Sequence, residues 1–264
     1  MNILVGCDPE VFVKQNNVFK SAFGLIKGDK KNPQKIRRGA VQVDGMALEF
    51  NIDPAATEDE FCINVQDVFA QMKLMVPDYE IVVSPVAKFD EAYMQQQPKE
   101  ALELGCDPDF NAWANGCVNE KPNGNRPMRT ASGHIHIGWT NGADIQDYSH
   151  RNDGCLAGKQ MDFFLGLPSL AYDDDTERRE MYGKAGCVRF KPYGVEYRTL
   201  SNAWLKSEKL MRLVYRNTIE GMKRLMAGDE LVNKYGDIQE IINTSNVKEA
   251  KRICKDAKIE VCNG

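Results

Sequence analysis

Residues 129–139 read RTASGHIHIGW, and this stretch holds two of the three histidines in the 264-residue chain. His134 and His136 are separated by one isoleucine, and a second isoleucine follows them. Because side chains two residues apart on a β-strand point to the same face, we expect both imidazoles on one face and both isoleucines on the other. Such a strand, bounded by glycines, predicts one wall of a metal or substrate site.

Three other apolar stretches carry polar pairs at the same spacing. If these stretches are strands of one sheet, their polar side chains would form a cluster of carboxylates, imidazoles and a guanidinium. Carboxylate oxygens with one imidazole suit Mg²⁺ or Mn²⁺, and an arginine suits a phosphate or carboxylate oxygen. The pairs are Asp8 with Glu10, Glu49 with Asn51 (Asp44 lies just upstream), and Glu196 with Arg198.

Each pair also has a simpler explanation. Alternating polar residues commonly mark only the solvent-facing side of an antiparallel strand. Glu196 and Arg198 would also fit a cross-strand ion pair. Pro9, between Asp8 and Glu10, is typical of a strand end, an edge strand or a bulge. A shared site explains all four pairs together better than four separate solvated faces do.

The composition is that of an ordinary globular protein, with 42% hydrophobic and 27% charged residues. A net charge of -4 argues against nucleic-acid binding, and no apolar run approaches the ~20 residues that span a membrane. The N-terminus lacks the features of a signal peptide, so we expect a cytoplasmic protein. The eight cysteines form no CxxC pair, which favours free thiols over a zinc site or a disulfide framework.

The remaining patterns predict a single α+β domain over residues 1–264, with residues 229–264 as a helical C-terminal extension. Residues 105–128 are rich in Gly, Asn and Pro, which is typical of a functional loop or lid. We expect strands at residues 2–13, 41–52, 80–89 and 191–200, with a turn at Asp44-Gly45 in the second. We expect helices at residues 57–75 (with Thr57 and Glu60 as a capping box), 155–165, 207–227 and 246–257.

Positive charge gathers just before the predicted strand that carries Glu196. This local excess suits a polyphosphate, although Arg178 and Lys191 are interpreted as solvent-facing. Residues 154–159 (GCLAGK) are one residue short of a phosphate-binding glycine loop and lack its Ser or Thr, and no GxGxxG follows a strand. A nucleotide would therefore be held by metals and arginines. The basic residues are Arg178, Arg179, Lys184, Arg189 and Lys191.

Five stretches, in this order, resemble the phage-encoded COOH–NH2 ligase-like proteins (amidoligase type 2), a branch of the glutamine-synthetase-like ligases. GHIHIG together with VEYR is the most specific part, and the resemblance extends over residues 6–204. The stretches are GCDPEVFV, VDGMALEFN, RTASGHIHIGW, MYGKAG and KPYGVEYRTLSNAW.

The resemblance implies a curved, mainly antiparallel β-sheet with helices on its convex side and ATP-dependent chemistry on its concave side. It assigns metal binding to Asp8, Glu10, Glu49, His134 and Glu196, with Asp44 as a possible helper. It assigns a nucleotide or substrate contact to His136, although the two histidines could exchange roles. Arg198 would bind the transferred phosphoryl group and act with Glu196 in catalysis, and Arg179 and Arg189 would bind phosphate.

The expected activity is an ATP- and Mg²⁺-dependent (or Mn²⁺-dependent) carboxylate–amine ligase that forms an amide or peptide bond through an acyl phosphate. Its substrates would be small-molecule or peptide carboxylates and amines, in the host cytoplasm if the protein is phage-encoded. The number of metals, the individual substrates and the oligomeric state remain open. One alternative is a cupin-type HxH metal oxygenase, for which only His150 could supply a third nitrogen ligand. A metal-dependent amidohydrolase meets the same objection, and a phage interaction protein that keeps the fold without the chemistry is the third alternative.

Overall fold

The computed structural model describes residues 2–103, 108–120 and 127–262. Its strands are β1 (Leu4–Gln15), β2 (Val18–Lys20), β3 (Gln34–Ile36), β4 (Gly39–Asp44), β5 (Ala47–Ile52), β6 (Glu80–Val82), β7 (Val86–Lys88), β8 (Phe110–Asn111), β9 (Cys117–Val118), β10 (Met128–Thr130), β11 (Gly133–Gly138), β12 (Cys187–Lys191) and β13 (Gly194–Tyr197). Its α-helices are α1 (Glu58–Met75), α2 (Glu91–Gln95), α3 (Lys99–Leu102), α4 (Tyr148–Met161), α5 (Leu167–Ser169), α6 (Glu177–Met181), α7 (Glu208–Met226), α8 (Leu231–Tyr235), α9 (Gln239–Asn243) and α10 (Val247–Asp256). Short 3-10 helices cover Ala112–Ala114 and Asn202–Lys206, and a π-helical turn covers Asp162–Gly166.

One open antiparallel sheet organises the described chain, in the order β3-β4-β5-β1-β11-β13-β12-β8-β9. The long strand β1 lies at its centre, and its second half also pairs with β2 and β6. Strands far apart in the sequence thus become neighbours: β11 lies between β1 and β13. This order places the histidine strand between the strands that carry Asp8 and Glu196.

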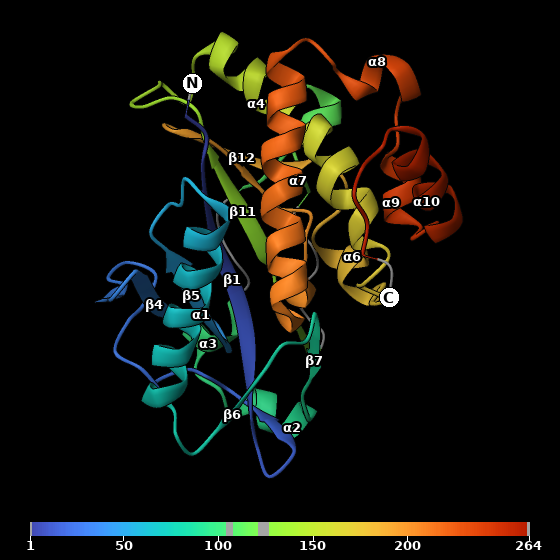
Figure 1. Ribbon diagram of the computed structural model, residues 1–264. Helices are drawn as coiled ribbons and strands as arrows, with labels where there is room; N and C mark the ends of the chain where they lie inside the picture. Colours follow the sequence, from blue (N-terminus) through green and yellow to red (C-terminus); the bar gives the residue numbers. More distant parts are fainter. Residues whose placement is uncertain (1, 104–107, 121–126, 263–264) are drawn as a thin grey trace.

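Helices cover one face of this sheet (Figure 1). Helix α1 packs on β4 and β5, α4 packs on β12 and β13, and α7 contacts both helices. Strand β1 alternates accordingly, because Val5, Cys7 and Val11 are buried in the core beneath the helices, while Asp8 and Glu10 point to the opposite face. The predicted α+β fold, a mainly antiparallel sheet with helices on one side, is therefore confirmed.

The helix boundaries follow from local capping. The Thr57 side chain accepts a hydrogen bond from the Glu60 backbone N–H, as the predicted capping box requires, but the Glu60 carboxylate accepts one from the backbone N–H of Ala56 rather than of Thr57. Helix α7 begins in the same way, with the Ser207 side chain as cap. In both helices the apolar stripe faces the core, which is what fixes them to the sheet.

A second, smaller apolar cluster lies on the face of the sheet that α1, α4 and α7 leave uncovered. Phe12, two residues beyond Glu10, packs edge-on against Phe89 with ring centroids 6.3 Å apart. Met46, Met94 and Ala101 complete this cluster. It borders the polar stretch of β1 and so limits the polar site to the first part of that strand.

The structure corrects several local predictions. Pro9 lies inside a central strand rather than at a strand end, edge or bulge. Its missing N–H faces the β5 side, where pairing begins only at Glu10, so no ladder bond is lost. The predicted strand at 191–200 is the second half of a hairpin with β12, which was not predicted, and the strand at 80–89 is broken at Pro85 into β6 and β7.

The segment around His150 differs from expectation, and the predicted loop at 105–128 lies partly outside the described residues. His150 precedes the helix expected at residues 155–165 but lies in the first turn of α4, because the Asp147 side chain caps that helix. Of the predicted loop at 105–128, residues 105–107 and 121–126 lie outside the described residues, and the remainder contains β8 and β9, which extend the sheet beside β12. Its role as a lid stays a prediction.

Two observations concern the whole of the described chain. None of its helices combines the length and apolar character needed to cross a bilayer. Seven of the cysteines lie within the description and all are free thiols. The remaining one, Cys106, lies outside the described residues.

Candidate metal centre and phosphate-binding cluster

The register of four neighbouring strands brings the predicted polar residues onto one sheet face. Asp8 on β1 lies opposite His134 on β11, and His136 lies opposite Glu196 on β13. On the other side of β1, Glu10 lies opposite Glu49 on β5. Since antiparallel partners in register point the same way, these side chains form one continuous polar surface.

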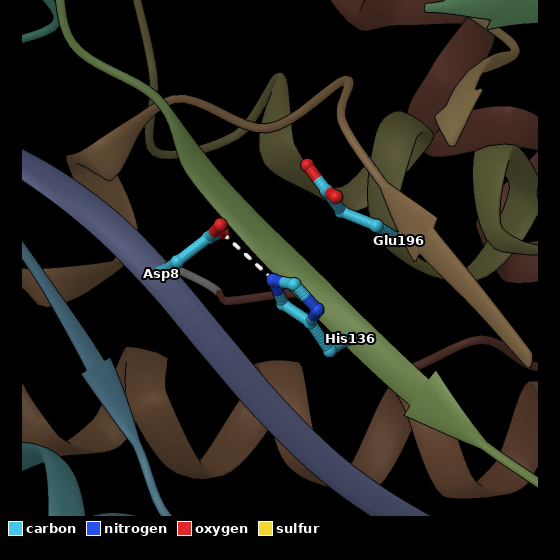
Figure 2. A group of neighbouring side chains, drawn as sticks. All are labelled: Asp8, His136 and Glu196. Carbon is cyan, nitrogen blue, oxygen red and sulfur yellow. Dashed lines mark ion pairs between the residues drawn. The ribbon is translucent and has the colours of Figure 1, made fainter. Parts of the chain in front are cut away.

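Asp8, His136 and Glu196 form the first group that could hold a metal ion (Figure 2). One ligand atom from each residue lies within 4.8 Å of those of the other two. His136 Nε2 is 3.0 Å from Asp8 Oδ1, yet neither atom has a hydrogen-bond partner within the described structure. A cation that binds both atoms would replace this buried contact once the imidazole has lost its proton.

His134 lies against the same two carboxylates. Its Nδ1 is 3.3 Å from Asp8 Oδ1 and 3.4 Å from Glu196 Oε1, and only 6% of the residue is exposed. Burial and the neighbouring Arg198 lower the pKa of His134 to about 4. The imidazole is therefore neutral at pH 7, the form that binds metals.

The pKa values of Asp8 and His136 in the first group are shifted from their ordinary values. Burial raises the pKa of Asp8, but the charges of His136 and His134 outweigh it and hold that pKa well below its ordinary value. Burial also lowers the pKa of His136, but the Asp8 carboxylate outweighs this and raises it. Without a metal, His136 and Asp8 thus form a buried ion pair, and a cation bound there would displace the histidine proton.

Tyr193 was not predicted as a site residue, and it orients His136. The Tyr193 hydroxyl lies at hydrogen-bond distance from His136 Nδ1, so the other ring nitrogen points at Asp8. Such a contact to the second imidazole nitrogen is what fixes a metal-binding histidine. The sequence offered a weak signal, since Tyr193 lies in the turn that precedes the Glu196 strand.

Three cationic side chains converge on the Glu196 carboxylate, which is completely buried. Arg198 and Arg189 contact Oε1, the latter at 3.4 Å, and Lys191 Nζ is 2.9 Å from Oε2. Burial and Asp8 raise the pKa of Glu196, but Arg198 and the two imidazoles outweigh them and bring it to about 2. Three positive charges around one carboxylate leave an excess that can bind an anion.

Arg198 is held by a second carboxylate as well. Its Nε lies 3.8 Å from Asp109, in the described part of the segment before β8, and its guanidinium lies 3.4 Å from His134 Nδ1. The side chain is 14% exposed. Arg198 is thus held between His134, beside the first group, and Asp109.

Glu10, Asp44 and Glu49 form a second group, made only of carboxylates. Their ligand atoms also lie within 4.8 Å of one another. Glu49 accepts a hydrogen bond of 2.8 Å from Gln42, and Glu10 accepts one of 2.7 Å from the Ser132 backbone N–H. Burial and the charge of Asp44 raise the pKa of Glu10 to about 7, and burial and the neighbouring carboxylates raise that of Glu49 well above its usual range.

The structure contradicts the expectation for Arg178, and phosphate binding by the adjacent Arg179 stays a prediction. Arg178, predicted to face solvent, is only 2% exposed, and it donates to the carbonyls of Thr199 and Arg198 at 2.8 and 3.4 Å. Arg179, predicted to bind phosphate, donates to Ser245 Oγ and the Asp175 carbonyl. Helix α6 therefore directs Arg178 toward the site and Arg179 toward the C-terminal helices.

Lys191 and His150 also differ from expectation. Lys191, predicted to face solvent, contacts Glu196 within the cationic cluster. The ring of His150 lies on the helix side, where its Nε2 is 2.8 Å from the Lys191 carbonyl oxygen. Among the described residues, neither of the two groups that could hold a metal ion includes His150, so the oxygenase alternative lacks its third nitrogen ligand.

Comparison with known families agrees with the resemblance drawn from the motifs. Residues 130–219 match the model of a family described as Phage phiEco32-like COOH.NH2 ligase-type 2. This segment carries both strand histidines, Glu196 and Arg198, and over it the resemblance is confirmed. A comparison with curated proteins gave no significant match.

Two solved structures are similar over most of this chain. One is described as a novel glutamine synthase homolog, with 9% identity and a TM-score of 0.44, and the alignment covers 96% of this chain and 62% of that chain. The other is described as a GmaS/ADP complex, with 11% identity and a TM-score of 0.43, covering 99% of this chain and 71% of that one. The present chain thus spans less than two thirds of the length of the first.

Proposed function

We propose that the protein is an ATP- and Mg²⁺-dependent carboxylate–amine ligase that acts through an acyl phosphate. One observation carries the proposal: a carboxylate–imidazole group and a cluster of three cations share the buried carboxylate of Glu196. A site for a divalent cation directly beside a site for anionic oxygen is what phosphoryl transfer requires. The ligase-type family match over residues 130–219 supports the same activity.

The residues of both acidic groups fit Mg²⁺ or Mn²⁺. The first offers two carboxylates and one imidazole, with Asp8 Oδ1 and His136 Nε2 facing each other at 3.0 Å. The second offers three crowded carboxylates, the oxygen-only set that hard cations prefer. When held by these side chains, divalent cations would neutralise the charge that develops during transfer.

The cationic cluster would bind the transferred phosphoryl group. Arg198, Arg189 and Lys191 are all engaged with Glu196 in the metal-free protein. If Glu196 becomes a metal ligand, it shares its negative charge with the cation. The three cationic side chains can then bind phosphate oxygens. Arg198, fixed by Asp109, is the residue we assign to the γ-phosphoryl group.

The proposed reaction has two steps. A carboxylate oxygen of the acid attacks the γ-phosphorus of ATP, the bond to the β-phosphate oxygen breaks, and ADP leaves. The amine nitrogen then attacks the carbonyl carbon of the acyl phosphate and loses a proton to water. Inorganic phosphate leaves with one former carboxylate oxygen, and the amide keeps the other.

The test is ADP release, measured against a panel of carboxylates and amines with Mg²⁺. We expect a carboxylate–amine pair to stimulate release, and Glu196→Ala to reduce it by about 10²-fold or more, because a preorganised charge is lost. Glu177→Ala is the matched control, since Glu177 pairs with Lys88 on the surface. Release that no pair stimulates, or that survives in the Glu196 variant, contradicts the proposal. Nucleotide binding without turnover would favour a protein that keeps the fold only for interaction.

A further inference from the structure

A lysine ammonium already lies at the second acidic group. Lys30 Nζ is 2.7 Å from Asp44 Oδ1, and 48% of the lysine side chain is exposed. Asp44 shares that group with Glu10 and Glu49. The chain therefore places one of its own cations where we propose that a divalent cation binds.

The backbone fixes this position. The Asp29 side chain accepts a hydrogen bond of 2.9 Å from the Asn32 backbone N–H, closing a tight turn around Lys30. Val43 donates to the Gly28 carbonyl at 2.9 Å, and Asp29 bridges to Val43. The turn is thus pinned to β4 beside Asp44, and the Lys30 ammonium can move into solvent without the turn unfolding.

Charge balance explains why a cation is drawn to this place. Three carboxylates converge here, with ligand atoms that all lie within 4.8 Å of one another. Burial lowers the pKa of Lys30, but the Asp44 carboxylate outweighs it and raises that pKa. One ammonium pairs with only one of the three carboxyl groups, whereas a divalent cation could bind oxygens from several of them at once.

We propose that Lys30 is a tethered competitor of the divalent cation at the Glu10–Asp44–Glu49 group. It neutralises Asp44 in the metal-free protein, and it must release Asp44 before the cation takes that oxygen. Lys30 thereby sets the cation concentration at which the second group fills. This inference rests on the proposed function, because it takes the second group as a metal site.

The test compares Mn²⁺ binding, measured by calorimetry and by electron paramagnetic resonance without nucleotide, in four variants. A partly exposed ion pair is worth up to about 1 kcal/mol, so Lys30→Gln is expected to tighten binding by about fivefold. Lys30→Arg keeps the charge and should resemble the wild type. Lys31→Gln, one residue along and exposed, is the matched control. Adding Asp44→Asn to Lys30→Gln should abolish the tighter Mn²⁺ binding, which would assign that binding to the Glu10–Asp44–Glu49 group.

Each remaining outcome overturns the inference in a recognisable way. Equal Mn²⁺ affinity in Lys30→Gln and the wild type, or weaker affinity in Lys30→Gln, refutes competition but leaves the proposed metal site intact. If Lys31→Gln tightens Mn²⁺ binding by the same factor, the effect comes from general surface charge and the inference is wrong. If neither the wild type nor Lys30→Gln binds Mn²⁺, the metal dependence of the proposed function fails together with the inference.

Discussion

A buried carboxyl group lies on each face of strand β13, and ion pairs or hydrogen bonds satisfy each of them. On the site face, Glu196 is completely buried and contacts three cations. On the helix face, the neighbouring Tyr197 donates a hydrogen bond of 2.7 Å to Asp162, whose other oxygen accepts one of 2.6 Å from Trp113 Nε1. Asp162 thus ties β13 to the segment that follows β8, and holds Glu196 in place from behind.

Asp162 gives a prediction for stability against pH. Burial raises its pKa from 3.8 to about 6, despite these hydrogen bonds. Between those values the folded state keeps a proton that the unfolded state has lost, so stability falls as pH rises through this window and is level above it. The loss is on the order of 2 to 3 kcal/mol.

The measurement is urea unfolding of the wild type and Asp162→Asn from pH 4 to pH 7.5. The variant cannot titrate at this position, so the difference in unfolding free energy should shift in its favour as pH rises to about 6. Asp153→Asn, on the exposed side of α4, is the control and should track the wild type. A difference between wild type and Asp162→Asn that stays constant over this range would rule out the raised pKa.

At the level of secondary-structure elements, the segment around Ser201 and Trp204 packs closely on the start of β11 and thereby fixes the strand that carries both histidines. Gly133 begins the strand, and a Cβ there would lie 2.2 Å from the Ser201 carbonyl oxygen and 2.4 Å from Trp204 Nε1. The Trp204 indole donates to the Gly133 carbonyl at 3.0 Å. The 3-10 helix Asn202–Lys206 therefore packs directly on the start of β11.

Gly133→Ala should accordingly destabilise the protein by on the order of 2 kcal/mol or more, because the Ser201 backbone and the buried Trp204 side chain must both shift. It should also weaken Mn²⁺ binding, since β11 carries both histidines. Gly138→Ala at the other end of the same strand is the control, because its nearest neighbours are 3.7 Å away and the substitution fits. Equal stability of the two variants would show that this contact does not fix β11.

The sequence predicted which residues share a strand face, but not which strands are neighbours. The two-residue spacing was enough to place His134 with His136 and Asp8 with Glu10, because it reflects strand geometry alone. Pairing of Asp8 with His134 joins residues 126 positions apart, and no local pattern specifies such a contact. The strand β12 was missed because its basic residues resemble a solvated segment, although they meet a buried carboxylate.

The same limit explains the site residues that sequence reasoning missed or misplaced. Arg178 and Arg179 are adjacent and chemically identical, and only the packing of α6 sends one toward the site and the other away. Lys30 lies in a basic, turn-rich segment with nothing to distinguish it from its neighbours. Its role appears only once β4 and the turn before it are placed side by side.

At the scale of the whole molecule, the sheet separates stability from chemistry. Its helix-covered face holds the large apolar core, and the other face carries two acidic groups and a cationic cluster in a row across β4, β5, β1, β11, β13 and β12. Neighbouring strands fix each group on rigid backbone, which suits a reaction that depends on positioning and charge. We propose that this row activates a carboxylate with phosphate from ATP.

Isotope transfer tests that claim most directly. The carboxylate that best stimulates ADP release is prepared with ¹⁸O in both oxygens and incubated with protein, Mg²⁺, ATP and amine, and the products are analysed by mass spectrometry. An acyl phosphate requires that released phosphate carries one ¹⁸O and the amide the other. Phosphate without ¹⁸O, formed alongside an amide or with no amide at all, would contradict the account.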